Sequence, residues 1–328
     1  MALFPGLGWG INKIRFGFVG LFLRLTNNWR ALERVTADAW MLKWAGRTVY
    51  EQMWKPLLVG KFGPYYRDVN MAWMWARLHA RTTRLGTFEG GFQNFADLFA
   101  EKLRSMGVGI RLSVKVESIK RDPAAGCLVV QSDHGAASFD KVLVTTSPAQ
   151  MARLSPELPK DYLEGLLKLE SMGAVVMVLS LKQQLSEEGY YWYNIPKSAG
   201  FPFLAVVEHT NYVPKEKFGG DTIVYIGDYL EPDHEYFKLS DDELLKLFAP
   251  HLKKFNPCFE MDWVKKAWVF KTAYAQPVPL VNHSRNIPAI QTPVEGLYFA
   301  SMSQVYPWDR GTNFAVEIGR RAARLMTE

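Results

Sequence analysis

The residues with the clearest chemical potential stand near the end of the chain. Residues 296–300 are an apolar run typical of a buried strand, and a helix is predicted from about Thr312 to Met326. The helix opens at Gly311-Thr312-Asn313, where the first backbone N–H groups lack intrahelical partners and carry partial positive charge. Such a helix end binds a phosphate or the electron-rich edge of a heterocycle. A strand-loop-helix unit without a ligand is the alternative, since α/β domains commonly contain one.

Three side chains are candidates for catalysis. Asp309 and Arg310 directly precede this helix, and an internal ion pair is the alternative interpretation of the two. The polar run 208–211 ends an apolar strand and either faces a site or forms a surface turn. The third candidate is Tyr274. It belongs to a group of aromatic residues that indicate either an apolar pocket or the ordinary core of a sheet. The other members are Tyr190, Tyr191, Trp192, Tyr193, Phe203 and Trp268.

Apolar spacing predicts the elements that position these residues. Residues 1–86 show helical spacing, with a helix start at Thr36, a break at Pro56 and a loop at 60–64. Residues 165–275 contain five predicted strands with one helix between them. This arrangement predicts a largely antiparallel sheet with helices on one face.

A glycine turn at Gly90-Gly91 marks a change in the character of the chain. Glycines suit a cofactor site, because a phosphate approaches the backbone only where no side chain intervenes. After the turn, the pattern predicts an amphipathic helix from about Gln93 to Met106 and then short strands at Ile110–Ile119, Leu128–Ser132 and Lys141–Thr145. This order of elements favours a nucleotide-binding α/β domain with a small antiparallel flap.

In their order and spacing, these segments resemble the flavin-dependent oxidoreductases of the amine oxidase, protoporphyrinogen oxidase and phytoene desaturase superfamily. The resemblance implies FAD as the cofactor. It also implies an α/β (α+β overall) fold, with a Rossmann-like FAD-binding domain and a substrate domain of helices and a mixed or antiparallel sheet. The residues that it implies for FAD binding are Gly90, Gly91, Val116, Ser301, Met302, Arg310, Gly311, Thr312 and Asn313.

The roles of these residues follow from the same resemblance. Val116 would meet the adenine through its backbone, and the amides of 311–313 would face the flavin ring or the pyrophosphate. Ser301 and Met302 stand at the turn that binds the ribityl chain, where the family usually has a glycine and an acidic residue. We therefore expect Ser301 or the backbone to replace the carboxylate contact.

The resemblance divides the chain into four segments. The helical part of the substrate domain is expected at 1–86 and its sheet at 161–275. The middle part of the FAD-binding domain is expected at 87–160 and its C-terminal part at 276–328. Both domains are therefore discontinuous in sequence.

The dinucleotide fingerprint of such a domain is a strand, a G-x-G-x-x-G turn and a helix. The one glycine cluster near the start, from Gly6 to Gly10, follows Pro5 and no predicted strand, so we reject it as this fingerprint. We therefore expect that the FAD-binding domain lacks its first βαβ segment. By this expectation, about a hundred preceding residues belong to the native chain or were lost through truncation or a gene-model error. FAD affinity is then expected to be low or absent.

The leading hypothesis is oxidation of an apolar or polycyclic substrate, such as a porphyrinogen or a carotenoid, by hydride or two-electron transfer to FAD. Amine oxidases carry a lysine near the flavin, whereas Met177 stands at the matching position, which argues against an amine. The second hypothesis is a flavin-dependent sugar mutase, which needs an arginine-rich site that strands within 175–230 do not offer. The third is a non-catalytic remnant that binds an apolar ligand or partner.

Composition narrows the class of protein. The chain is 48% hydrophobic and 22% charged, as a folded globular protein is. Two isolated cysteines, Cys127 and Cys258, predict neither a metal site nor a disulfide framework and indicate a reducing, cytoplasmic location. The net charge of +6 comes without the basic run and interleaved aromatics that an RNA-binding sheet shows, so no nucleic-acid partner is expected.

An apolar run at Phe16–Leu23 raises the question of a membrane. It is too short for a spanning helix, which needs about 20 apolar residues. A buried helix is the first interpretation, and a helix lying on a membrane surface is the second, so a peripheral membrane contact stays a hypothesis. The oligomeric state is not predicted.

Overall fold

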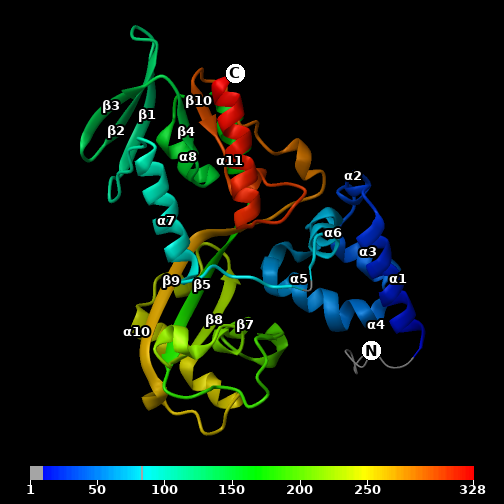
Figure 1. Ribbon diagram of the computed structural model, residues 1–328. Helices are drawn as coiled ribbons and strands as arrows, with labels where there is room; N and C mark the ends of the chain where they lie inside the picture. The colour runs from blue at the N-terminus through cyan, green and yellow to red at the C-terminus, as the bar shows by residue number, and fades with distance from the viewer. Residues whose placement is uncertain (1–9, 83) are drawn as a thin grey trace. The chain divides into compact units, whose positions relative to one another are not determined.

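The computed structural model describes residues 10–82 and 84–328 (Figure 1). Helices and strands both contribute to it, and the mixed α/β class predicted from the sequence is confirmed. Of the glycine cluster between Gly6 and Gly10, the described residues include Gly10 alone, which directly precedes the first helix.

The chain forms two compact units, each built from two segments. Unit 1 contains Met1–His79 and Glu170–His283, and unit 2 contains Ala80–Leu169 and Ser284–Glu328. The predicted domain limits at 86, 160 and 275 lie close to the limits of the two units at 79, 169 and 283. The assignment of FAD to one unit and substrate to the other stays a prediction.

The first segment of unit 1 is helical. Thr36 begins one helix as predicted, because its hydroxyl oxygen accepts a hydrogen bond from the Ala39 N–H at 3.3 Å. The helices are α1 (Ile11–Leu25), α2 (Trp29–Leu32), α3 (Ala37–Trp44), α4 (Arg47–Val49), a π-helical turn (Tyr50–Trp54), α5 (Lys55–Phe62), a 3₁₀ helix (Gly63–Arg67) and α6 (Met71–His79).

The helix break predicted at Pro56 and the loop predicted at 60–64 are both wrong. The π-helical turn Tyr50–Trp54 leads directly into α5, and Pro56 lies in the first turn of that helix. The Lys55 N–H donates to the Tyr50 carbonyl five residues back, so the hydrogen-bond ladder is already displaced where the proline would otherwise interrupt it. Gly60 lies inside α5 against the side chain of Leu204, which leaves no room for a Cβ.

The predicted buried helix at the start of unit 1 is half-exposed. Of the residues of α1, Val19 and Leu23 are buried, whereas the opposite side of the helix carries several exposed apolar side chains. Within the described residues, no helix combines the length and apolar character needed to cross a membrane.

The second segment of unit 1 forms the predicted antiparallel sheet. Its strands lie in the order β6-β7-β8-β5-β9, and every neighbouring pair is antiparallel. The strands are β5 (Ser171–Leu181), β6 (Trp192–Asn194), β7 (Ala205–Glu208), β8 (Thr222–Leu230) and β9 (Val264–Pro277). The predicted helix is α10 (Asp241–Phe248), which begins with a capping box between Ser240 and Glu243.

One face of this sheet packs into the core of unit 1. Val175, Met177 and Leu179 alternate along β5 toward this core, where Leu244 and Phe248 of α10 are also fully buried. Successive side chains of a strand point to opposite faces. The intervening residues of β5 therefore lie on a second face, which is described with the site below.

The polar run 208–211 has a structural role at its first residue. Glu208 is fully buried, and its carboxylate accepts hydrogen bonds from the backbone N–H groups of Leu185 and Ser186, the Ser186 hydroxyl and the Asn211 amide. Four donors satisfy this carboxylate without a solvent contact. Glu208 therefore neither faces an open site nor lies in a surface turn.

Unit 2 contains two small sheets and four α-helices among its described residues. The antiparallel flap is β1 (Val116–Asp122), β2 (Cys127–Ser132) and β3 (Gly135–Phe139), and β4 (Val142–Val144) pairs in parallel with β10 (Leu297–Phe299). The predicted strand Ile110–Ile119 therefore begins later, at Val116. The helices are α7 (Gly91–Ser105), α8 (Pro148–Leu154), α9 (Lys160–Leu167) and α11 (Thr312–Thr327).

The β4–β10 pair is covered on both faces, as parallel strands usually are. On one face, Phe299 and Val144 pack in a core with residues of the flap, α8 and α9. On the other, Tyr298 and Ala300 pack against Ile318 and Ala322 of α11. These contacts fix α11 along the strand pair.

Helix α7 is amphipathic as predicted, but its apolar face is uncovered. None of its residues, all of which the structure describes, is buried. Phe92, Leu98 and Phe99 are more than half exposed, and the rings of Phe88, Phe92, Phe95 and Phe99 stack along the helix. No contact within unit 2 therefore buries this face.

His209 follows β7 and lies among aromatic rings. Its imidazole contacts Tyr191, Tyr212, Phe218 and Tyr225, with centroid distances from 5.5 to 6.4 Å. Burial lowers the pKa of His209 below its ordinary value, because the charged imidazolium loses solvent contact. The folded state therefore favours the neutral ring.

This lowered pKa makes the stability of unit 1 sensitive to acid. The unfolded imidazole takes up a proton below about pH 6.5, whereas the folded one resists it, so the free energy of unfolding should fall as the pH falls from neutral toward about 5. His209→Phe keeps the ring contacts and cannot titrate, so urea unfolding should show a weaker pH dependence for this variant. His134→Phe, at an exposed turn, is the control and should behave like the wild type. Equal pH dependence of His209→Phe and the wild type would contradict the interpretation.

Candidate functional site

The carboxyl end of the β4–β10 pair brings together several predicted cofactor residues. Beyond Phe299, the Ala300 N–H still donates to the Val144 carbonyl at 3.0 Å, and the chain then turns at Ser301. Helix α11 returns along the pair, since Tyr298 Oη donates to the Leu325 carbonyl near the end of the helix. The start of α11 therefore lies at the same end as Ser301, the end where parallel sheets bind ligands.

A buried glutamine holds this turn in place. Gln304 Oε1 accepts a hydrogen bond from the Ser301 N–H at 2.7 Å, and its Nε2 donates to the carbonyls of Phe299 at 2.9 Å and Pro288 at 3.1 Å. The sequence analysis missed Gln304. Its only signal was an amide three residues after a serine, the spacing of a capping box.

Ser301 has an unsatisfied polar atom at this turn. Its side chain is buried, and the Oγ faces the Gln304 N–H in a capping-box arrangement without a hydrogen bond of ordinary geometry to any described residue. A buried hydroxyl without a partner is costly, so it marks a place where a ligand or water completes the bonding. This observation fits the prediction that Ser301 contacts a cofactor.

The start of α11 is open to a ligand. Gly311 is the N-cap, and among the described residues no side chain caps the helix. Gly311, Thr312 and Asn313 are exposed, whereas the interior residues Ile318 and Ala322 are buried. The first N–H groups therefore point into accessible space with the positive end of the helix dipole behind them.

The segment before α11 carries the first-ranked catalytic pair. Asp309 Oδ1 accepts a hydrogen bond from the Arg310 N–H at 3.0 Å, and both residues are half-buried. The rings of Trp308 and Phe314 stack at 5.8 Å across the start of the helix. The pair therefore lies beside the α11 start, while its catalytic role stays a prediction.

The second set of predicted cofactor residues lies at the start of α7 and of β1. Gly90 and Gly91 have φ angles of +73° and +80°, a left-handed conformation that favours glycine, and Gly90 is the N-cap of α7. Val116 pairs with Ser132 at the first position of β1. In Figure 1, α7 and α11 begin toward the same end of unit 2. Contact of these residues with an adenine or a phosphate stays a prediction.

Unit 1 offers an aromatic surface on the second face of its sheet. The cross-strand register places one row across all five strands, and this row consists of Trp192, Val207, Tyr225, Val178 and Trp268. The next row consists of Asn194, Ala205, Gly227, Val176 and Phe270. Trp192, Trp268 and Phe270 are 43–61% exposed, so this open sheet face presents a flat apolar surface.

The aromatic candidates of the sequence analysis separate between the two faces. Phe203 is buried in the core, so an apolar pocket is the wrong interpretation for this residue, whereas Trp192 and Trp268 belong to the open sheet face. Met177 is also in the core and shows no exposed surface. Tyr274 lies in a bulge of β9 opposite Gly173, because Met172 and Ala174 of β5 pair with Gln276 and Thr272. Bulges often re-aim a side chain next to a site, but the catalytic role of Tyr274 stays a prediction.

Lys61 is a further charged residue that the sequence analysis missed. It lies in α5 with 8% of its surface exposed, and its Nζ lies 4.5 Å from the centroid of the Tyr229 ring. A third row of the open sheet face is centred on Ala174 of β5, which pairs with Tyr229 of β8 on one side and with Thr272 of β9 on the other. The lysine charge is therefore stabilised by an aromatic ring at the margin of this face. A helical lysine gives no sequence signal of its own burial.

Comparison with protein families decides the class of this chain. The family model of the flavin-containing amine oxidoreductases matches residues 13–327. The chain belongs to this family. The enzyme is therefore an FAD-dependent oxidoreductase, as the sequence analysis predicted from the resemblance. No curated protein matches the chain in sequence.

Solved structures confirm the fold. A candidate protoporphyrinogen oxidase from Exiguobacterium sp. 255-15 is similar with a TM-score of 0.73 and 17% identity over 98% of this chain and 73% of that one. A reduced UDP-galactopyranose mutase has a TM-score of 0.68 and 12% identity over 89% and 67%. Cyclohexylamine oxidase from Brevibacterium oxydans IH-35A has a TM-score of 0.62 and 15% identity, and the match covers 93% of this chain and 70% of that one. At these identities the likeness establishes the fold and not the substrate.

The residues of unit 2 fit one end of an FAD molecule. The unsatisfied Ser301 Oγ and the uncapped start of α11 offer a donor and a positive helix end to a flavin. The pyrophosphate end has less support, since G-x-G-x-x-G occurs nowhere in the 328-residue sequence. Among the described residues, no three His, Cys, Asp or Glu side chains gather as metal ligands.

Removing the Gln304 amide is expected to loosen the turn. Gln304→Ala leaves the buried Ser301 N–H and two carbonyl groups without partners, which should lower the free energy of unfolding by roughly 2–3 kcal/mol. The control Gln150→Ala removes a half-buried amide that accepts from Arg153 in α8 and should cost less than about 0.5 kcal/mol. Urea denaturation followed by circular dichroism measures both. Equal stability of the two variants would show that Gln304 does not hold the turn.

Proposed function

We propose that unit 2 binds FAD at the carboxyl end of β4 and β10, and that unit 1 presents an apolar or polycyclic substrate on its open sheet face. The reaction is then a two-electron oxidation of that substrate. FAD, when bound, supplies the electron-accepting chemistry. A cytoplasmic location belongs to the same proposal.

The observation that carries the cofactor half of the proposal is the Ser301 turn beside the α11 start. Ser301 Oγ lacks an ordinary partner, and the exposed amides of 311–313 lie at the same end of the strand pair. In this proposal Ser301 donates to the ribityl chain, while the amides of 311–313 stabilise electron-rich oxygen atoms of the ring or phosphate. Gly90, Gly91 and Val116 then hold the remainder of the cofactor.

The open sheet face supports the substrate half of the proposal. Two rows of side chains cross the five strands, and their exposed members Trp192, Trp268 and Phe270 are aromatic. A flat apolar molecule gains contact area on such a surface without needing charged partners. Residues 175–230 contain no arginine, so this surface does not suit the diphosphate of a nucleotide sugar. The sugar mutase therefore remains the second hypothesis.

A negative charge introduced at the α11 start tests the cofactor site. Asn313→Asp keeps the size of the side chain and favours the helix dipole, so the fold should persist, while the new negative charge should weaken FAD binding roughly tenfold. Asn12→Asp places the same change in the first turn of α1 in unit 1 and should leave FAD binding unchanged. Titration of flavin fluorescence with the purified chain measures both affinities. An FAD affinity of Asn313→Asp equal to that of the wild type would contradict the proposed site.

Truncation of an aromatic residue tests the substrate surface. Trp268→Ala removes one exposed ring of the open sheet face and should weaken binding of a flat apolar probe, protoporphyrin, about tenfold. Trp44→Ala is the matched control, since Trp44 is 52% exposed on α3, against 43% for Trp268 on β9. Absorbance titration with protoporphyrin measures the binding. An equal effect of both truncations would show general apolar adhesion rather than a site.

A further inference from the structure

Helix α1 carries a row of apolar side chains that the fold leaves in solvent. Each member of the row is 51–72% exposed, and the spacing of three and four residues places the members on one side of the helix. We call this surface the α1 face, and it consists of Ile11, Ile14, Phe18, Leu21, Phe22 and Leu25. A soluble helix normally turns such a row toward the core.

The α1 face is held outward by contacts on the other side of the helix. Val19 and Leu23 are buried in unit 1. Arg15 donates to the carbonyls of Lys43 at 2.9 Å and Trp44 at 3.2 Å, and Arg24 donates to the carbonyl of His79 at 2.5 Å. Two arginines thus clamp α1 to neighbouring helices, so rolling the row inward would break these bonds.

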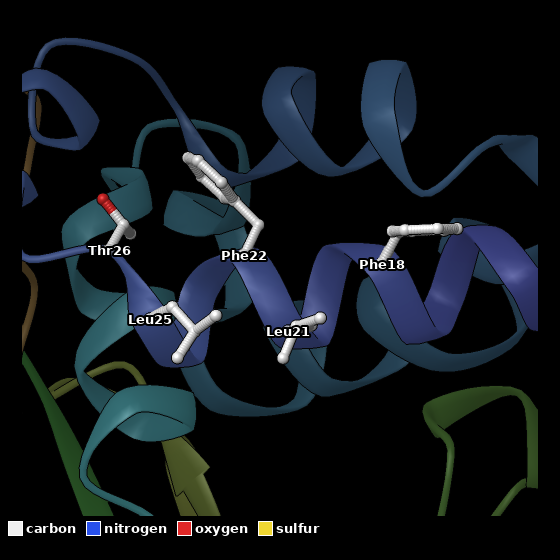
Figure 2. Close-up of a pocket in the computed structure, with 5 residues that line it drawn as sticks. All are labelled: Phe18, Leu21, Phe22, Leu25 and Thr26. Carbon is white, nitrogen blue, oxygen red and sulfur yellow. The ribbon is translucent and has the colours of Figure 1, made fainter.

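Figure 2 shows the shape of this surface. Phe18 and Phe22 lie along one edge of α1, Leu21 and Leu25 lie along the other, and Thr26 closes the end of the row. The Phe22 ring stacks on Trp40 of α3 at 6.0 Å. The apolar strip therefore continues from α1 onto α3, where Trp44 is 52% exposed.

Positive charge accompanies the apolar strip. Residues 10–47 contain seven Lys and Arg and two Asp and Glu, so their formal net charge is 7 − 2 = +5, against +6 for the whole chain. Arg30 lies over the Trp29 ring at 4.5 Å, and Lys43 lies over the Trp44 ring at 5.2 Å. Trp29 is half-buried and Trp44 is exposed. Cations beside tryptophans near the surface suit the headgroup region of a bilayer, where both groups are favoured.

We propose that the α1 face is a docking surface for an anionic lipid bilayer, on which α1 lies in the plane of the membrane. Its 15 residues span about 22 Å, too short to cross the hydrocarbon core but suited to lie at the interface. A second copy of the chain is disfavoured as the occupant, because a two-fold contact would bring together two copies of a segment with a net charge of +5. The proposal is independent of the cofactor site in unit 2.

The experiment compares vesicle binding by matched variants of the full chain. Vesicles of phosphatidylcholine with phosphatidylglycerol are sedimented with wild type, Leu21→Glu and Leu98→Glu, and vesicles of phosphatidylcholine alone serve as the neutral surface. Leu21 on α1 and Leu98 on α7 are 54% and 58% exposed, so both variants add the same charge at an exposed leucine. We expect wild type and Leu98→Glu to sediment with the anionic vesicles, and Leu21→Glu to lose about tenfold in affinity.

Light scattering without vesicles separates lipid from protein contacts, and circular dichroism verifies the fold of each variant. Binding that persists in Leu21→Glu, or that fails for wild type on anionic vesicles, overturns the proposal. So does equal loss in Leu98→Glu, which would assign the adhesion to apolar exposure in general. Self-association of wild type that Leu21→Glu abolishes, without vesicle binding, would assign the α1 face to a second copy.

Discussion

The parallel pairing of β4 with β10 is the interaction on which the rest of unit 2 depends. Three residue pairs join 142–144 to 297–299 across an intervening stretch that includes the sheet of unit 1. Closing so long a loop would cost entropy in a flexible chain. The antiparallel pairing of β5 with β9 reduces that cost, because Ser171 pairs with Pro277 and the Val278 N–H donates to the Glu170 carbonyl. The fold of unit 1 thus brings the two halves of unit 2 within reach.

The same alternation that builds the core of unit 1 also exposes its aromatic surface. Met177 faces the core, and its neighbour Val178 lies in the row with Trp268 and Tyr225. A register slip of one residue would bury the aromatic row and expose the core, so the register is strongly specified. Gly227 contributes to this close fit, since a Cβ there would approach the Val175 carbonyl oxygen to 2.6 Å. One geometric rule therefore sets both stability and the proposed substrate surface.

Local signals in the sequence predicted most elements, and long-range contacts account for the failures. The helix starts at Thr36 and Ser240 were predictable because a polar cap next to an apolar repeat is a local signal. The prediction of a helix break at Pro56 failed because a π-helical turn directly precedes α5 and leaves Pro56 in the first turn of that helix. The Gln304 clamp was invisible because one partner, Pro288, lies 16 positions away. The resemblance to a family supplied the cofactor, which no spacing alone could establish.

The uncovered face of α7 has a consequence for the energetics of unit 2. A helix of 15 residues is marginal in water on its own, and no residue of α7 is fully buried, although Phe95 and Leu103 are half-buried. Its persistence depends on its ends and on the ladder of phenylalanine rings along it. Its amide hydrogens should therefore exchange with solvent through local openings that leave the flap and the β4–β10 pair intact. The glycine pair at its start thus belongs to the least cooperative part of the unit. A ligand that binds there would use part of its binding free energy to order the helix.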